Sequence, residues 1–380
     1  MPTLTVVVEQ MVAPVPGGTG RVTAELTAAL AHGAPPGWRV RTVCAWHRSV
    51  DAAVVSGPFG PIRPRRLPLG RRVLTALWER GLPPLLHGDA VLAPTPLFPP
   101  AIPAGLQRIR GRQQRIVIVH DAVPYTHPET LTPRGVHWHR RMIGRAAQGA
   151  DAIIVPSRAV ADALATQLRI GAPVMPVGWG VGLSFEVPDD AAARVQRLGL
   201  AGPYLLFVGT VEPRKGLDLL IAALAAAAAA GATPLLAVAG PAGWGGVDLD
   251  AMVAAAGLSA ERVRRLGRLD DVDLTAVMAG ARALVAPSRA EGFGLPVLEA
   301  MSLGVPVIVS DVSALTELVG NAGMVVPVDD PRALANAIVG LGDKSKRAHY
   351  SKAGRGRAAH YSWDNAARIL WQWISSTSSS

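Results

Sequence analysis

The sequence predicts an α/β protein with two Rossmann-like, doubly wound parallel-sheet domains that face each other across a cleft. Three observations lead to this prediction. A chain of 380 residues is too long for one ordinary core and suits two domains. Short apolar runs that end in polar residues alternate with helical stretches, as in buried parallel sheets. The segment 176–190, rich in Gly and Pro, is typical of a linker.

The first half supplies three predicted strands, residues 4–10, 115–121 and 151–157. The first strand leads into the glycine-rich stretch PVPGGTGR and then into a helix, VTAELTAALAHG. Residues 134–145 predict a further, basic helix. Because strands and helices alternate along this half, we place the first domain at residues 1–182.

The second half repeats the alternation, so residues 183–362 form the predicted second domain. Residues 361–374 have the pattern of an amphipathic helix that packs through Trp363 and Trp373. We expect the segment 363–380 to pack back on the first domain and to end in a frayed Ser-rich tail. The predicted strands of the second domain are residues 204–210, 234–240, 263–269, 283–288 and 305–311.

Several classes of protein are disfavoured by the pattern of residues. The start of the chain lacks a basic region and contains Glu9, so it does not resemble a signal peptide. The uncharged run 219–240 has the length of a membrane span, but Gly231 and Pro234 divide it into a helix and a strand. The single cysteine, Cys44, excludes an intramolecular disulfide framework and a Cys-cluster metal site. We therefore expect a cytoplasmic protein.

Positive charge is concentrated in the first half. The net charge is +10, and residues 1–180 hold 20 Arg and no Lys against 9 acidic residues. Such a field attracts a phosphate-bearing substrate, anionic lipid or nucleic acid. With only 4 Tyr and 5 Phe and no aromatic-plus-basic strand, the sequence disfavours nucleic acid. The basic helix at 134–145 fits an anionic membrane surface and fits a solvated helix equally well. The basic clusters are Arg63, Arg65, Arg66, Arg71 and Arg72, then Arg108, Arg110, Arg112 and Arg115, then residues 134–145.

A pair of glutamates marks the first candidate site, in EGFGLPVLEA. Glu291 lies in the loop after a predicted strand, and Glu299 lies inside the helix that follows. The glycines between them allow backbone amides to approach a phosphate. Because a carboxylate repels a diphosphate, we expect both glutamates to face hydroxyl groups, as on the two sugar rings of a nucleotide sugar. The alternative is that both glutamates only stabilise the helix start.

Two cations form the second candidate site. Arg214 and Lys215 directly precede a predicted helix, where a positive charge opposes the helix dipole unless an anion is bound. Together they supply a fork and a point charge that can stabilise a departing nucleoside diphosphate without a metal. The alternative is a pair of solvated loop cations.

Two competing motifs are weak. The DLD stretch at 248–250 has metal-ligand spacing, but it opens a helix, where acidic residues are expected as stabilisers. We therefore expect no metal site. The stretches GGTG at 17–20 and GWGVG at 178–182 lack the spacing of a dinucleotide-binding loop, which disfavours an oxidoreductase.

The motifs together resemble the family 4 retaining glycosyltransferases, which have the GT-B fold. The resemblance is strongest over residues 204–338, in VGTVEPRKG, VAGPAGWG, LGRLDDVDL, APSRAEGFGLPVLEAMSLGVPVIVSD and VVPVDDPRALANAI. It implies that Glu291 and Glu299 hold donor hydroxyls, with Glu291 also at the reacting centre, and that Arg214 and Lys215 bind the diphosphate and act in catalysis. It also implies a donor-binding role for the start of the helix, at Phe293, Gly294 and Leu295.

The first half resembles the same family. PGGTGRVTAEL is similar to its glycine-rich loop, which implies that Gly18 faces the donor phosphates and the acceptor. VIVHDAVPYTHPE is similar to its His-Asp segment, which implies that His120 is catalytic and contacts the donor sugar. Asp121 would orient His120 or cap the loop. One departure is Trp179, which stands where the family commonly has the Asn of an Asn-Gly-Val turn.

The resemblance implies a metal-independent reaction in which the leaving diphosphate accepts the proton of the acceptor hydroxyl. No cofactor is expected besides the nucleotide sugar, and the EPRK variant is similar to the mannosyltransferase-like branch, which favours GDP-mannose as donor. The acceptor would be a glycan, a lipid-linked glycan or a phospholipid, as in cell envelope glycan synthesis. The basic first domain would then contact the cytoplasmic face of the membrane. A UDP-sugar donor, or a protein that binds nucleotide sugars without catalysis, stays open as an alternative.

Overall fold

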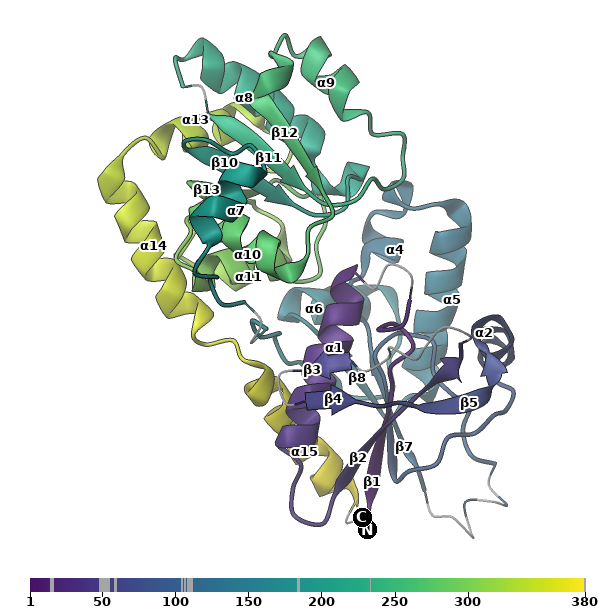
Figure 1. The fold of residues 1–380 in the computed structure, drawn as a ribbon. Helices are drawn as coiled ribbons and strands as arrows, with labels where there is room; N and C mark the ends of the chain where they lie inside the picture. Colours follow the sequence, from purple (N-terminus) through teal and green to yellow (C-terminus); the bar gives the residue numbers. More distant parts are fainter. Residues whose placement is uncertain are drawn as a thin grey trace. The chain divides into compact units, whose positions relative to one another are not determined.

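A computed structural model describes residues 1–13, 17–47, 55–57, 60–103, 105, 107, 112–182, 185–232 and 234–378 (Figure 1). The chain forms two compact units. The first comprises Met1–Pro128, Thr132–Gly180 and Ser362–Ser380, and the second comprises Glu129–Leu131 and Val181–Tyr361. Arg108 and Arg110 of the predicted basic clusters lie outside the described residues, as do residues 183–184 of the predicted linker.

The first unit is built on a seven-stranded sheet in the order β5-β2-β1-β6-β7-β8-β9, and every pair in it is parallel. A separate antiparallel pair joins β3 to β4. The strands are β1 Thr3–Val7, β2 Arg39–Trp46, β3 Val55–Gly57, β4 Gly60–Ile62, β5 Arg65–Gly70, β6 Ala90–Ala93, β7 Gln114–Ile118, β8 Ala152–Val155 and β9 Val174–Pro176. The helices are α1 Gly17–His32, α2 Arg71–Glu79, α4 Val123–Thr126, α5 Pro133–Gly149, α6 Arg158–Gln167 and α15 Trp363–Ser378.

The three strands predicted in the first half are confirmed as β1, β7 and β8. All four residues of β8 are buried, which is why a short, purely apolar run identifies it. Helix α1 begins at Gly17, within the stretch expected to be a glycine-rich loop, so Gly18 lies in the first helical turn. Helix α5 begins after Thr132, whose hydroxyl accepts a hydrogen bond from the Gly135 amide at 3.1 Å, a side-chain N-cap.

Helix α15 belongs to the first unit. The Trp371 indole donates a hydrogen bond to the Leu30 carbonyl of α1 at 3.0 Å. The Gln114 amide of β7 donates to the Ile374 carbonyl at 3.2 Å. These buried contacts attach the end of the chain to α1 and β7, and Figure 1 shows α15 alongside α1.

The second unit is built on a six-stranded parallel sheet in the order β12-β11-β10-β13-β14-β15. Its strands are β10 Tyr204–Val208, β11 Leu235–Ala239, β12 Val263–Gly267, β13 Ala283–Ala286, β14 Val307–Ser310 and β15 Met324–Val326. Its helices are α7 Ala191–Arg197, α8 Leu217–Ala229, α9 Leu249–Ala255, α10 Asp271–Gly280, α11 Leu295–Ser302, α12 Ser313–Val319, α13 Pro331–Gly340 and α14 Lys344–Ala358, with 3-10 turns η2 Pro213–Lys215 and η3 Ala260–Arg262.

All five strands predicted in the second half are confirmed. Leu205 and Leu206, neighbours in β10 that point to opposite faces of the sheet, are both fully buried, so both faces are covered. The apolar run 219–240 divides into α8 and β11, as its Gly and Pro predict. Within the described part of the chain, no helix combines the length and the apolar character needed to cross a membrane.

In both sheets the order of the strands reverses at the first strand, because the following strands lie on one side of it and later strands on the other. In the first unit β1 lies between β2 and β6, and in the second unit β10 lies between β11 and β13. Ligands of open α/β sheets bind at this topological switch point, beyond the carboxyl ends of the strands. Ligand sites are therefore expected at the loops after β1 and β6 in the first unit and at the loops after β10 and β13 in the second.

Candidate active site

The loops after β10 and β13 approach each other closely. Gly216 follows the 3-10 turn η2 with a left-handed backbone (φ 67°) and precedes α8. A side chain at this position would place its Cβ 2.0 Å from the Pro287 carbonyl oxygen. Only glycine fits the turn, and its close packing fixes Arg214 and Lys215 beside the β13 loop.

The structure brings Arg214, Lys215 and Glu291 into direct contact. Lys215 Nζ lies 2.5 Å from Glu291 Oε1, and Arg214 NH1 lies 3.3 Å from Glu291 Oε2. The Ser288 hydroxyl donates to Glu291 Oε1 at 2.9 Å, and Arg214 NH2 donates to Glu212 Oε1 at 2.6 Å. We call these five residues the charge cluster. Both cations thus bind the Glu291 carboxylate directly, a contact that the sequence did not predict.

The charge cluster holds two cations and two carboxylates in a largely buried position. Burial alone would raise the pKa of Glu291, but the charges of Lys215 and Arg214 outweigh it and lower that pKa to about 2. Glu212 is only 2% exposed, and its Oε2 has no hydrogen-bond partner among the described residues. The cluster is thus nearly neutral overall, and an anion that binds its cations competes with Glu291.

Helix α11 carries the second glutamate. Gly294 precedes it with φ 99°, and a Cβ at this position would lie 2.6 Å from a Leu315 side-chain carbon. The helix therefore begins abruptly, and Leu295 is its first residue. Glu299, in the second turn, is 1% exposed. Such a buried carboxylate suits a fixed acceptor of hydrogen bonds.

Phe293 differs from the other predicted donor residues. Its side chain is 6% exposed and packs edge-to-face against Tyr361, with ring centroids 5.7 Å apart. The ring belongs to the core of the second unit. The polar groups that Phe293 offers to a ligand at the start of α11 are those of its backbone.

Arg289 braces the site and was not predicted from the sequence. Its guanidinium binds Asp218 of α8 at 2.7 Å and Asp329 at 2.8 Å, and it donates to the Pro213 carbonyl at 3.0 Å. Its backbone amide also donates to the Arg214 carbonyl at 2.8 Å. Arg289 thereby connects the two loops of the site.

Glu212 and Ser288 were also missed. Glu212 stands in EPRK, two residues before Arg214, so an acidic residue beside the two candidate cations was the available signal. The hydrogen bond from Ser288 to Glu291 could also have been expected from the sequence, because the two residues are only three positions apart.

His120 and Gly18 lie in the first unit. His120 follows β7, and its Nε2 lies 2.8 Å from the Pro94 carbonyl oxygen. Because a carbonyl only accepts, Nε2 carries the proton and Nδ1 is the acceptor of the neutral ring. Burial lowers the pKa of His120, which favours this neutral form. Asp121 accepts a bond from the Val123 amide at 3.1 Å and so caps the loop.

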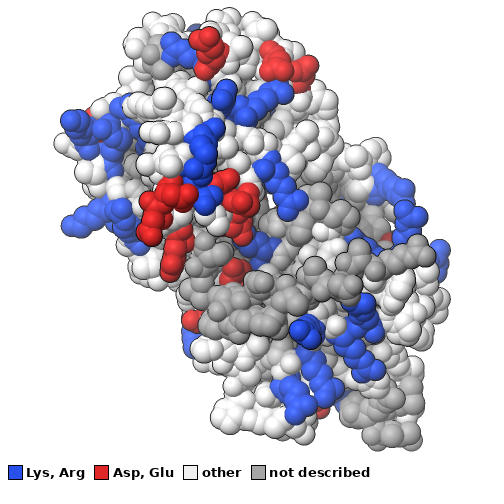
Figure 2. Space-filling model, in the orientation of Figure 1, with Lys and Arg blue, Asp and Glu red and all other residues white. Residues whose placement is uncertain are grey.

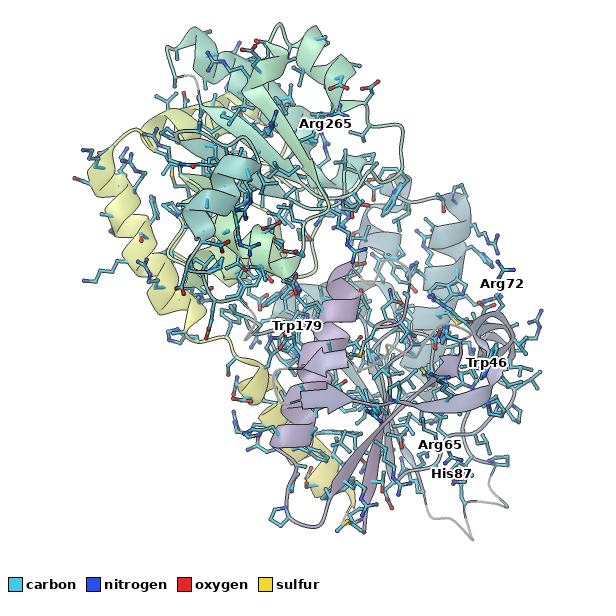
Figure 3. All side chains as sticks on the ribbon, viewed as in Figure 1. Trp46, Arg65, Arg72, His87, Trp179 and Arg265 are labelled. Carbon is cyan, nitrogen blue, oxygen red and sulfur yellow. The ribbon has the colours of Figure 1, made fainter. Side chains whose placement is uncertain are left out.

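Trp179, labelled in Figure 3, is buried, and its ring lies next to that of His120. It stacks on Trp363 with centroids 5.7 Å apart and 21° between ring planes. Its centroid lies 6.2 Å from that of His120. Trp179 is 1% exposed, so the departure from Asn places a large buried ring against the predicted catalytic histidine.

The stretch 248–250 has a structural explanation. Asp248 caps α9 by accepting hydrogen bonds from the amides of Asp250 and Ala251 at 3.0 and 3.1 Å. Asp250 binds Arg265 at 2.6 Å. The interpretation of residues 248–250 as the start of a helix is confirmed. No group of three or more His, Cys, Asp or Glu side chains within the described ranges has the arrangement of a metal site.

Two family models match the chain. The model described as Glycosyltransferase Family 4 matches residues 16–184, and the model described as Glycosyl transferases group 1 matches residues 202–344. Together they cover most of both units. The second match contains the charge cluster and α11, and the first contains Gly18 and His120.

Individual relatives match over shorter stretches. The O-antigen chain mannosyltransferase B of Escherichia coli is 40% identical over 182 residues, which cover 47% of this chain and 47% of that protein. The phosphatidyl-myo-inositol mannosyltransferase of Mycobacterium leprae is 30% identical over 247 residues, which cover 60% of this chain and 58% of that protein. The chain thus spans about half the length of the relatives it matches.

A solved structure matches over the whole chain. The sucrose-phosphate synthase of Thermosynechococcus elongatus superposes with a TM-score of 0.73 at 23% identity, covering 99% of each chain. At this identity the likeness concerns the fold, and the predicted GT-B fold is confirmed.

Proposed function

Because the chain belongs to glycosyltransferase family 4, we propose that it moves a hexose from a nucleoside diphosphate sugar to a hydroxyl group, with retention and without a metal. One observation carries the proposal: Arg214, Lys215 and Glu291 meet at the switch point of the second sheet. Cations held before α8 suit a diphosphate, and the carboxylate among them suits a ligand that also bears hydroxyls.

In this proposal Lys215 and Arg214 bind the diphosphate of the donor. The backbone amides at the start of α11 add hydrogen bonds and a favourable helix dipole. Glu299 accepts hydrogen bonds from hydroxyls of one sugar ring and Glu291 from the other. His120 and Gly18 of the first unit are proposed to contact the donor sugar and the phosphates, respectively.

The proposed transfer replaces one bond at the anomeric carbon with another. The oxygen of the acceptor hydroxyl forms a bond to the anomeric carbon, and the bond from that carbon to the diphosphate oxygen breaks. Its electron pair stays on the diphosphate, which takes up the proton of the hydroxyl on the same face. Lys215 and Arg214 stabilise the charge that develops on the leaving group.

We propose mannose from GDP-mannose as the first donor, because two relatives are named mannosyltransferases. A UDP-sugar carrying glucose, galactose or N-acetylglucosamine is the alternative. The test incubates the protein with each donor, an acceptor panel and a chelator, and measures nucleoside diphosphate release and the anomer formed. We expect transfer with one donor, and at least a hundredfold loss in Lys215→Gln. Efficient turnover in Lys215→Gln, or an inverted product, would refute the proposal.

A catalytically silent nucleotide-sugar binding protein is the second candidate. It would keep the charge cluster and its affinity for a nucleotide. The same assay separates the two candidates, since a silent protein would bind a donor and release no diphosphate above the rate of a donor-only blank, whatever the acceptor.

The acceptor is proposed to be a glycan, a lipid-linked glycan or a phospholipid, and the first unit is proposed to contact an anionic membrane at its cytoplasmic face. Figure 2 shows basic side chains on the drawn face of this unit. On α5, however, Arg140 and Arg145 donate to the carbonyls of Pro124 and Trp78, and Arg141 forms an ion pair with Glu79, so these guanidinium groups are already engaged within the protein. The exposed arginines of β5 and α2, including Arg65 and Arg72 (Figure 3), are the better candidates.

Co-sedimentation with vesicles of anionic phospholipid tests this contact. We expect binding that decreases as salt is raised, because counterions screen surface charges. Binding should also weaken when Arg65 and Arg72 are both replaced by Gln. Sedimentation that equals the control with neutral vesicles would contradict the proposal.

A further inference from the structure

The first unit contains a cavity of about 480 Å³ at its own switch point. It is lined by residues that follow β1, β6 and β7, together with residues of α2 and α5. Pockets for small ligands generally have volumes of about 300 to 1,000 Å³. The cavity thus has the size and the position of a ligand site, and His120 stands in its wall.

The wall of the cavity combines apolar and polar side chains. Leu74 of α2 and Ile143 of α5 are each 2% exposed and form part of its apolar surface. Glu9 follows β1, and His120 and Asp121 follow β7. An apolar surface with a few converging polar groups is suited to a sugar ring, which has apolar C–H faces and hydroxyl edges.

The charges of the cavity are unfavourable to a phosphate. Arg71 is the one Lys or Arg among the described lining residues, and its Nε lies 3.6 Å from Glu9 Oε1. Asp121 adds a second carboxylate. Burial lowers the pKa of both His120 and His139, so neither imidazole supplies a full positive charge at neutral pH. The lining therefore carries one more negative than positive charge.

We propose that this cavity binds the acceptor as a neutral sugar residue and disfavours an acceptor that carries a phosphate on the same ring. The proposal rests on the glycosyltransferase activity proposed above, and it narrows the acceptor class. Hydroxyls of a neutral ring can donate to Glu9 and Asp121, and the ring brings no charge that Arg71 alone would have to balance. A phosphate elsewhere in a lipid-linked acceptor lies outside the cavity, where the exposed arginines of β5 and α2 suit it.

Glu9 is positioned for such recognition. Its Oε2 accepts a hydrogen bond from the Ala45 amide at 2.8 Å, and its Oε1 lies 3.0 Å from His47 Nε2. Its side chain is 17% exposed. The carboxylate is thus held in place by β2 and the residue after it while part of it still faces the cavity.

The test uses a substitution that fills the cavity and a matched one that does not. Thr75 of α2 lines the cavity, whereas Val73 of the same helix is 51% exposed and is not part of the lining. We expect Thr75→Trp to block the cavity and Val73→Trp to leave it open. The probes are methyl α-D-mannopyranoside and methyl α-D-glucopyranoside as neutral sugars, and myo-inositol 1-phosphate as the phosphate-bearing ring. Saturation-transfer NMR measures the binding of each probe to each variant.

We expect wild type and Val73→Trp to bind at least one neutral glycoside at least tenfold more tightly than the inositol phosphate. Thr75→Trp should lose that binding. In Glu9→Gln the preference for the neutral glycoside should fall at least threefold, a change of selectivity that a general folding defect does not produce. Tighter binding of the inositol phosphate, or no glycoside binding that Thr75→Trp removes, would overturn the inference.

A nucleotide-binding control separates this inference from the proposed function. The charge cluster lies in the other unit, so Thr75→Trp should keep the thermal shift that a nucleoside diphosphate produces. Nucleotide binding with no cavity-dependent glycoside binding refutes the inference alone. Absence of nucleotide binding in wild type refutes the proposed function instead.

Discussion

Replacement of Glu291 by Gln should have opposite effects on nucleotide binding and on sugar transfer. The Glu291 carboxylate occupies Lys215 at 2.5 Å and Arg214 at 3.3 Å, the two cations proposed to bind the diphosphate. Gln keeps the shape of the side chain and removes its charge. The affinity for a nucleoside diphosphate without sugar should therefore rise, while transfer of the sugar should fall.

The size of the effect follows from the pKa of Glu291. A fall from 4.5 to about 2 corresponds to a preference for the charged form of about 3 kcal/mol. A diphosphate that binds the two cations must displace the Glu291 carboxylate, and this displacement costs part of the roughly 3 kcal/mol. Because the Glu291 side chain is 11% exposed, solvent screens the attraction between the carboxylate and the cations only partly. We expect Glu291→Gln to bind the nucleoside diphosphate about tenfold more tightly, or about 1.4 kcal/mol. We expect kcat to fall by about a hundredfold, because a charged acceptor for the sugar hydroxyls is lost.

Isothermal titration calorimetry with GDP and UDP measures the first effect, and initial rates measure the second. Lys215→Gln is the control, since it should weaken nucleotide binding and transfer together. Weaker nucleotide binding in Glu291→Gln, comparable with that in Lys215→Gln, would refute the competition between Glu291 and the diphosphate.

Three further outcomes follow from the same contacts. The folded-state pKa of Glu291 is depressed, so its charge stabilises the fold above pH 4.5, and this contribution is lost as the pH falls toward about 2. In urea unfolding, the difference in stability between wild type and Glu291→Gln should therefore shrink over this pH range, and a constant difference would contradict the prediction. Glu299→Gln should reduce transfer by at least a hundredfold with an unchanged circular dichroism spectrum, and near wild-type rates would exclude Glu299 from the site. Trp363 Nε1 is buried without a hydrogen-bond partner among the described residues, so the free energy of unfolding of Trp363→Phe in urea should lie within about 1 kcal/mol of the wild-type value. Trp363→Leu also removes the stack on Trp179 and should lower the free energy of unfolding by about 2 kcal/mol. Equal losses in the two variants would show that the ring stack contributes nothing.

The alternation of strands and helices was predictable because its signals are local. Most predicted strands are short apolar runs, because burial of both sheet faces makes such runs continuous, as in β8 and β10. The edge strand β12 differs, since its Arg264 and Arg265 are exposed. The start of α1 was misplaced, since glycines at a helix start are also typical of loops. Strands β2, β5, β6 and β9 of the first sheet and β15 of the second were not among the predicted strands. Strand β15 has only three residues and is too short to stand out.

Three members of the charge cluster were predicted from the sequence, whereas Glu212, Ser288 and the contacts among the five residues were not. Strand-end position and residue type identified Arg214, Lys215 and Glu291, because ligands bind at the carboxyl ends of parallel strands. Lys215 and Glu291 are 76 positions apart in the sequence, and Arg289 and Asp218 are 71 positions apart, so both contacts join distant parts of the chain. Such pairings depend on the adjacency of β10 and β13, which the sequence does not reveal. The cavity of the first unit was missed for the same reason, since several separate elements form it.

The most direct test of the proposed donor site is a thermal-shift series with GDP, UDP, ADP and their common sugar conjugates, in the presence of a chelator. We predict that one nucleotide stabilises the wild-type protein selectively, by about 2.7 kcal/mol when present at 100 times its dissociation constant. We also predict that Lys215→Gln loses most of this stabilisation. If no nucleotide stabilises the protein at millimolar concentration, or if Lys215→Gln responds as wild type does, the donor site is not where Arg214, Lys215 and Glu291 meet.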